Sequence, residues 1–370
     1  MHNRIRHLDL ARGIGILLIV LGHNRIFDLI NPVGHHILHS INMPMFFLMS
    51  GVFFKASTSI SSLALQKLDG VLKPVFVTLL LVAPLQPLLS HAPFAQFVAG
   101  SLYATGGTLR WTPLWFLPHL FLVFMAGRIY LEVAKRWQIS RRMSLLIGLC
   151  CITSTYFMFQ TMRSVPVPIP YLAYGNAGQI LGDLGLPFSA DLLLITVPIF
   201  LMGHALKEQI STFEPRVLYA LAALAVFGLM HYLGDGELNL SKRLFEDFLF
   251  NVGQTLCGVY LVLSVSVWTS RYLPGLRWLL LQAASASLFI LLFHDYLQRR
   301  SFRFFEEHGL SMVAAGMLAY LSAIILPTLF YQIVVRVRWL AVLWLPVKRV
   351  QRNRALNPVT VTDQRGSVAP

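Results

Sequence analysis

Long runs of apolar residues with no charge near their centres restrict most strongly how this chain can fold. A helix that crosses the hydrocarbon layer of a bilayer needs about 20 predominantly apolar residues, and the first run, Leu8–Phe27, reaches that length. Only 12% of the residues are charged, which is about half the share that is usual in soluble domains. Because so little charge cannot cover a water-facing surface, the sequence predicts an all-α integral membrane protein.

Ten apolar runs are expected to cross the bilayer. They are Leu8–Phe27, Leu38–Phe54, Pro74–Leu89, Leu114–Leu131, Met143–Phe159, Phe188–Leu206, Val217–Leu233, Phe248–Trp268, Leu276–Leu297 and Ser311–Val335. Residues 1–347 therefore form one membrane domain. The segment Thr161–Pro187 is rich in Pro and Gly and is predicted to be the longest loop. Residues 348–370 are polar and basic without periodicity, which predicts a disordered tail.

The distribution of positive charge predicts the orientation. An even number of spans puts both termini on one side, and most Lys and Arg residues fall in the segments that share that side. Cytoplasmic segments of membrane proteins are enriched in Lys and Arg, so both termini are expected to be cytoplasmic. The formal net charge of +14 is thus explained by topology in a lipid bilayer, and nucleic acid is not an expected partner.

The first run contains the ionisable residues Asp9, Arg12 and His23, with Arg25 near its end. Such groups cost about 2.5–3.5 kcal/mol on insertion, so they are functional candidates. Arg12 and His23 are 11 residues apart, which places them on one side of a helix, roughly 16 Å apart along its axis. The alternatives are an interfacial Asp9–Arg12 ion pair and a structural His23 that is hydrogen-bonded to a neighbouring helix.

Other polar residues fall in the same outer half of the bilayer. His39, His119 and His294 join His23 there, and Trp115 shares a helix face with His119. This pattern predicts a polar chamber that opens outward. The alternative is a set of interhelical hydrogen bonds worth about 0.6 kcal/mol each.

A stripe of polar residues, Ser287, His294 and Gln298, follows the ninth predicted span. The loop expected after it carries Arg299, Arg300 and Arg303. These arginines either receive an acidic glycan or a pyrophosphate-linked lipid carrier, or they contact lipid headgroups.

Three histidines, His35, His36 and His39, lie at the expected start of the second span. The spacing of His35 and His39 suits two metal ligands on one helix. Because no carboxylate or thiolate accompanies them in the sequence, no metal site is expected.

The first helix carries a family resemblance. The segment from Arg6 to His23 resembles the first helix of the acyltransferase-3 family of membrane acyltransferases, which is marked by an Arg, ten residues and then a His. Arg12 and His23 fit that spacing. The segment Asn42–Gly51 looks like the second-helix motif of the fucose 4-O-acetylase-like branch of this family.

Two later motifs agree with that branch. Trp115-Phe-Leu-Pro resembles its tryptophan motif, and the segment Ser287–His294 resembles its late helix that ends in His. Two departures matter. The branch often has His where this chain has Asn42, so that imidazole has no counterpart here unless His39 replaces it. Other branches have a Glu after a Trp-Ser-Leu motif, and its absence here favours the acetylase-like branch.

The resemblance implies the transfer of an acyl group from cytoplasmic acyl-CoA to a hydroxyl of an extracytoplasmic glycan or glycolipid. The expected donor is acetyl-CoA, with no permanently bound cofactor, and the expected acceptor is a surface or lipid-linked polysaccharide at a bacterial inner membrane. Arg12 and Asp9 are expected to hold the donor. His23 acts either as a general base or as a covalent acyl carrier. The residues expected to bind the acceptor are His294, Trp115, His119, Asn42 and Arg303.

Two other classes of protein compete with this interpretation. A transporter of a small polar or sugar-like solute also has polar residues at mid-membrane and helices interrupted by Gly and Pro. The two halves of the sequence show no internal repeat, however, and a transporter leaves the first-helix motif unexplained. A non-catalytic scaffold gives no reason for the insertion cost of Arg12 and His23.

Overall fold

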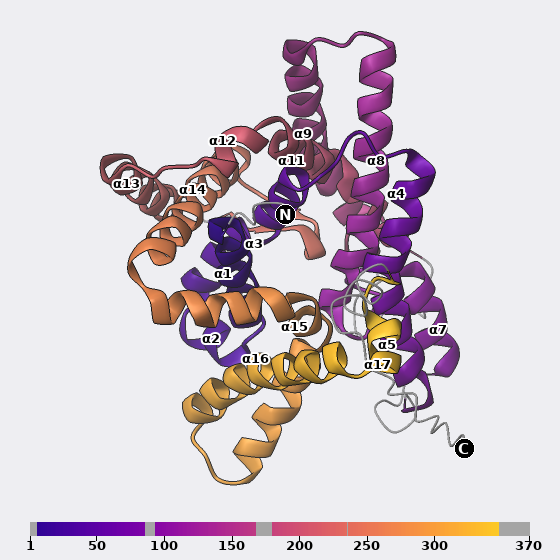
Figure 1. Cartoon of the computed structure of the whole chain (residues 1–370), viewed down its shortest axis with the longest axis vertical. Coiled ribbons are helices and arrows are strands. Elements are labelled where there is room, and N and C mark those ends of the chain that lie inside the picture. The colour runs from indigo at the N-terminus through magenta and orange to yellow at the C-terminus, as the bar shows by residue number, and fades with distance from the viewer. Residues whose placement is uncertain (1–5, 86–92, 168–179, 235, 348–370) are drawn as a thin grey trace, which may run out of the picture.

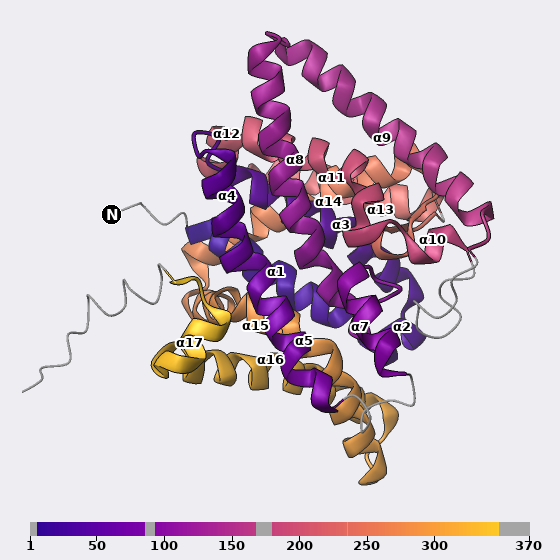
Figure 2. The same cartoon turned by 90° about the vertical axis from the view of Figure 1, so that its right-hand side faces the viewer.

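The computed structural model of the chain describes residues 6–85, 93–167, 180–234 and 236–347. The predicted tail, residues 348–370, lies outside them. The described chain is almost entirely helical (Figure 1 and Figure 2). Two short antiparallel strands, β1 (Leu238–Asn239) and β2 (Leu244–Phe245), pair with each other around the 3-10 turn η6 (Leu240–Lys242).

The first half of the chain forms α1 (Arg6–Gly22), α2 (Arg25–Ile30), α3 (Pro32–Val52), α4 (Ile60–Lys67), η1 (Leu68–Leu72), α5 (Lys73–Val82), η2 (Ala83–Leu85), α7 (Phe94–Tyr103), η3 (Thr112–Trp115), α8 (Phe116–Arg136) and α9 (Arg141–Ser164). The second half forms α10 (Leu181–Leu184), η5 (Pro187–Leu192), α11 (Leu193–Ala205), α12 (Lys207–Ser211), α13 (Val217–Leu233), α14 (Phe248–Tyr272), α15 (Pro274–Glu307), α16 (Met312–Arg336) and α17 (Arg338–Trp344).

Each of the ten predicted spans overlaps a helix, but not every helix is long enough to cross a bilayer. In the described parts of the chain, six helical segments are long and apolar enough: η3 with α8, α9, η5 with α11, α14, α15 and α16. The helix α13 matches its predicted span and is apolar, but it has only 17 residues. The structure therefore supports a multi-pass integral membrane protein, whereas the number of ten spans is not confirmed.

The helix α1 lies at the centre of the bundle, in contact with α3, α14 and α15 (Figure 1). Glycines on α1 allow this close packing. A Cβ at Gly13 would collide with the backbone carbonyl of Leu280 on α15, and one at Gly15 would collide with the side chains of Met45 and Phe46 on α3. The helix α1 is thus held between α3, which comes early in the chain, and α15 from its far end.

The first predicted span, Leu8–Phe27, is not one helix. The helix α1 ends at Gly22, and α2 starts at Arg25 after a turn. Asn24 causes the break, because its side chain accepts hydrogen bonds from the backbone N–H groups of Ile26 and Phe27 and so caps α2. The same side chain donates to the carbonyl of Gly316 on α16 at 2.9 Å.

The ninth predicted span was too short, and the loop predicted to carry Arg299, Arg300 and Arg303 is wrong. The helix α15 continues without interruption to Glu307, so all three arginines are helical. The apolar run ends at Leu297, but Gln, Arg and Glu residues beyond it are good helix formers. Arg299 also pairs with Asp295, one turn earlier, with 3.0 Å between Nε and Oδ1.

A buried ion pair joins two of the connecting segments. Both oxygens of Asp191 in η5 accept hydrogen bonds from Arg243, which follows η6, at 2.8 and 3.2 Å. Neither side chain is accessible to solvent. Both side chains make further hydrogen bonds. Arg243 also donates to Ser189 Oγ and to the carbonyl of Ser241. Asp191 accepts from the backbone N–H of Leu186. This network fixes the β1–β2 segment against the start of α11.

Candidate functional site

A cavity of about 630 Å³ opens at the C-terminal end of α1. The turn after α1, the first turns of α3, the β1–β2 segment, the C-terminal half of α15 and part of α16 all line it. His23 and Gln298 are among the lining residues. A polar cavity that includes His23 and His39 is therefore present, built from segments that are far apart in the sequence, whereas His119 and His294 do not line it. Its opening on the outer side of the membrane stays a prediction.

The imidazole of His23, in the cavity wall, lies beside that of His294, which is not itself among the lining residues. His23 follows α1 directly, with its backbone N–H still bonded to the carbonyl of Ile19 at 3.2 Å. Its ring centroid lies 5.2 Å from that of His294 on α15. His294 is fully buried, and its Nδ1 donates to the carbonyl of Ile290 at 2.8 Å. The proton on Nδ1 leaves Nε2 as an acceptor, and Nε2 has no hydrogen-bond partner among the described residues.

Asp295 and Gln298 bring further unsatisfied polar atoms from the same helix. Both residues line the cavity, and each is only 5% exposed to solvent. Asp295 Oδ2 and both polar atoms of the Gln298 amide lack a partner within the described part of the chain. A buried polar atom without a hydrogen bond costs about 1–3 kcal/mol. This wall of the cavity is therefore suited to a ligand that is rich in hydroxyl groups.

A smaller hollow of about 160 Å³ lies beside the other predicted catalytic residue, Arg12. Arg12 donates to the carbonyl of Ala284 on α15 at 2.9 Å and lies 3.6 Å from Asp9, so the predicted ion pair is present. The ammonium of Lys67 lines the same hollow and stands 3.4 Å from the ring centroid of Phe124. Sequence reasoning missed Lys67, because a lysine after an apolar span is read as an ordinary interfacial charge.

Packed aromatic rings lie beside the smaller of the two hollows. Phe46 lines this hollow and packs against Gly15, which lies between Arg12 and His23 along the chain. Phe116 lies 6.0 Å from Phe46 between ring centroids. Arg12 and His23 are thus near two separate hollows along the same helix.

His119, Trp115 and Asn42 lie in the core instead of the cavity wall. His119 is fully buried, with Nε2 2.9 Å from Thr196 Oγ1, and its ring centroid is 5.8 Å from that of Trp115. Asn42 is 4% exposed. None of the three lines the cavity beside His23 or the hollow beside Arg12. Their predicted contact with the acceptor stays a prediction.

The arginines of α15 separate into two groups. Arg299 and Arg303 line the cavity, whereas Arg300 instead lies over the ring of Tyr296, 5.7 Å from its centroid. The charged residues that line the cavity are equal in number for each sign, namely Arg25, Lys242, Arg299 and Arg303 against Asp28, Asp183, Asp295 and Glu306. The charge of the cavity is therefore mixed, not strongly basic.

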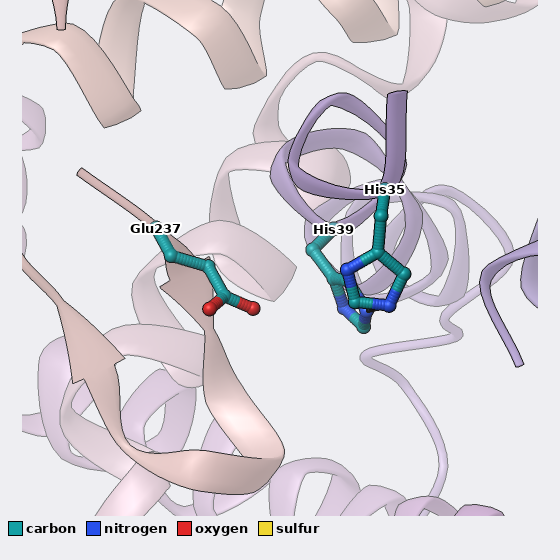
Figure 3. A group of neighbouring side chains, drawn as sticks. All are labelled: His35, His39 and Glu237. Atoms are coloured by element: carbon teal, nitrogen blue, oxygen red, sulfur yellow. Dashed lines mark hydrogen bonds between the residues drawn. The ribbon is translucent and has the colours of Figure 1, made fainter. Parts of the chain in front are cut away.

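A second group of polar side chains lies on the cavity wall, at the start of α3. His35 and His39 both line the cavity, and a carboxylate from the β1–β2 side, Glu237, faces them (Figure 3). One possible ligand atom from each residue lies within 4.8 Å of the others. The sequence showed no carboxylate beside these histidines, because Glu237 comes from a segment that only the tertiary fold brings close.

The fold and the cavity define the class as a helical, multi-pass integral membrane protein with a polar site at one end of its central helix. The profile of the acyltransferase-3 family, described as an acyltransferase domain, matches residues 5–332. This match covers most of the chain, which therefore belongs to the acyltransferase-3 family. Neither a curated protein nor a solved structure matches the sequence.

Proposed function

We propose that this membrane acyltransferase transfers an acetyl group from cytoplasmic acetyl-CoA to a hydroxyl of an extracytoplasmic glycan or glycolipid, at a bacterial inner membrane. The observation that supports this most is the pair of hollows along α1, one beside Arg12 and one beside His23. The resemblance of the segment Asn42–Gly51 to the fucose 4-O-acetylase-like branch supports acetyl as the group transferred.

The hollow beside Arg12 suits an anionic donor. Arg12 and Lys67 provide two cations there, and Asp9 together with the Ala284 carbonyl fixes the direction of the guanidinium. Arginine binds phosphate groups through a planar fork of donors. The helical rise between Arg12 and His23, roughly 16 Å, is comparable to the length of an extended pantetheine arm.

The cavity beside His23 suits a sugar. Asp295 and Gln298 offer unsatisfied acceptors and donors, as a ligand with several hydroxyl groups requires. The balanced charge of the wall favours a neutral sugar over a strongly acidic glycan. Arg303 is exposed at the end of the cavity, so we propose it as the cation of α15 that contacts the acceptor.

The chemistry follows from the two imidazoles. His23 takes the proton from the acceptor hydroxyl, whose oxygen attacks the thioester carbonyl. The carbon–sulfur bond then breaks, and the CoA thiolate leaves and takes up the proton from the imidazolium. His294 lies beside His23 with a lone pair on Nε2, so it can hold that imidazolium in place. A covalent acyl-His23 intermediate is the competing route.

The test uses the full chain in proteoliposomes with radiolabelled acetyl-CoA and polysaccharide, followed by NMR of the polysaccharide. We expect acetylation by wild-type protein, and a loss of at least about 100-fold in the His23→Ala variant, since general-base catalysis is worth 10²–10⁴-fold. His308→Ala removes an exposed histidine at the end of α15 and serves as the control. Solute uptake without consumption of acetyl-CoA would instead identify a transporter.

A further inference from the structure

The histidine pair on α3 has the geometry of two ligands on one metal ion. His35 and His39 are one turn apart, and their Nε2 atoms lie 3.1 Å from each other. Two nitrogens bound to one Zn²⁺ at about 2.0–2.1 Å lie roughly 3.3 Å apart in a tetrahedral site. The observed separation is close to that value, so both Nε2 atoms can bind one ion when neither carries a proton.

Glu237 supplies an oxygen ligand from the opposite side (Figure 3). Its Oε1 accepts a hydrogen bond from Asn239 Nδ2 at 2.8 Å, and its backbone N–H donates to Glu246 at 3.0 Å. The glutamate is therefore held on the side that faces the two imidazoles. A carboxylate also offsets part of the charge of a divalent ion.

The surroundings of His35 match those of a metal-bound histidine. Its Nδ1 lies 3.5 Å from Asp28 Oδ1, so a proton on Nδ1 points to a carboxylate. Histidine ligands commonly donate their other N–H to a carboxylate, which fixes the ring and leaves Nε2 for the metal. The carbonyl oxygen of Gly22 lies 3.1 Å from the same Nε2 and adds one more oxygen to the site.

We propose that His35, His39 and Glu237 bind a divalent transition-metal ion of the zinc class. The donor set of two imidazole nitrogens and one carboxylate oxygen suits Zn²⁺. The ion joins the first turns of α3 to the segment before β1 and so closes one wall of the cavity. Two of its ligands line the cavity proposed for the acceptor, but binding of the ion requires neither donor nor acceptor. The site replaces the expectation from the sequence that these histidines bind no metal.

The experiment measures metal in full-length protein that is purified without a polyhistidine tag, loaded with Zn²⁺ and then desalted. Elemental analysis should give about one equivalent per chain for wild type. His39→Ala should lose it, and the matched control His36→Ala, one residue from His35 and outside the group of three, should retain it. Co²⁺ serves as a second probe, because a four-coordinate site gives strong visible absorption.

A further variant distinguishes loss of a metal ligand from misfolding of the protein. Glu237→Gln keeps the size of the side chain but loses its charge, so the affinity for Zn²⁺ should fall by at least about tenfold while the gel-filtration profile is unchanged. The proposal is overturned if wild type retains no stoichiometric Zn²⁺. It is also overturned if Glu237→Gln binds as tightly as wild type, or if folded His39→Ala protein retains as much metal as His36→Ala protein.

Discussion

At the scale of single residues, the site depends on which polar atoms the protein leaves unsatisfied. The rings of His23 and His294 are 5.2 Å apart, and His294 Nε2 and Asp295 Oδ2 have no partner in the described chain. Arg12 and His23 were predicted from their spacing, because an arginine and a histidine at that distance share one side of a helix. The partnerless atom of Asp295 was not predicted, because the sequence does not show which side chains the fold will satisfy.

Arg12 belongs to the same scale, and its role depends on the shape of its head group. Arg12→Lys should lower kcat/KM for acetyl-CoA by about tenfold or more, since a charge-assisted hydrogen bond is worth about 1.5–3 kcal/mol. A lysine can reach the carbonyl of Ala284 or the carboxylate of Asp9. It lacks the planar set of donors with which arginine can bind these two groups and acetyl-CoA at the same time. Initial rates at varied acetyl-CoA concentration measure this. A fully active lysine variant would mean that charge alone is required.

At the scale of helices, the length of the apolar run is a poor guide to where a helix ends. The run Leu276–Leu297 predicted a loop after it, but α15 continues to Glu307 because charged residues of high helix propensity follow. For the first span the predicted helix was too long instead of too short. Asn24 caps α2 and so separates it from α1. Both corrections move residues that line the cavity.

The continuation of α15 gives a prediction about the acceptor. Arg303→Gln should raise KM for the polysaccharide severalfold and leave KM for acetyl-CoA unchanged, because Arg303 lines the cavity beside His23 and not the hollow beside Arg12. Arg300→Gln is the matched control on the same helix, since Arg300 is outside that lining. Kinetics with each substrate varied in turn distinguish the two effects. Loss of donor affinity in the Arg303 variant would contradict the proposed role.

The buried ion pair between η5 and the β1–β2 segment should contribute strongly to stability. Asp191→Asn leaves Arg243 buried without its counter-charge, so unfolding should become easier by about 3–5 kcal/mol. Thermal unfolding of the purified protein in detergent measures the change. Glu214→Gln disrupts an exposed ion pair with Arg271 and should leave the melting temperature almost unchanged. An equal effect of the two variants would show that burial of the first pair is unimportant.

At the scale of the whole molecule, hydropathy predicted the class of fold but not the shape of the site. All ten predicted spans contain a helix, since an apolar chain in lipid must satisfy its backbone internally. The cavity joins α1, α3, the β1–β2 segment, α15 and α16. Contacts between such distant segments depend on side-chain packing, which periodicity does not encode. Glu237 beside His35 and His39 is the clearest case.

The orientation is a prediction for the whole molecule. Both termini are expected in the cytoplasm, which places the turn between α8 and α9 inside and the end of α15 outside. In a variant without native cysteines, Trp137→Cys should be protected from a membrane-impermeant thiol reagent in intact cells, and Glu307→Cys should react. Both positions are exposed, so accessibility within the fold does not limit the reaction. The reverse labelling pattern would put the cavity beside His23 in the cytoplasm.

The ring of Phe46, which lines the smaller hollow and packs against Phe116, bears on the energetics of the cell. A membrane that stores energy as a proton-motive force is discharged by any continuous column of water through its proteins. Phe46 fills the space beside Gly15, on the part of α1 between Arg12 and the cavity beside His23. We therefore expect this enzyme to transfer a small group across the bilayer while no protons leak along its central helix.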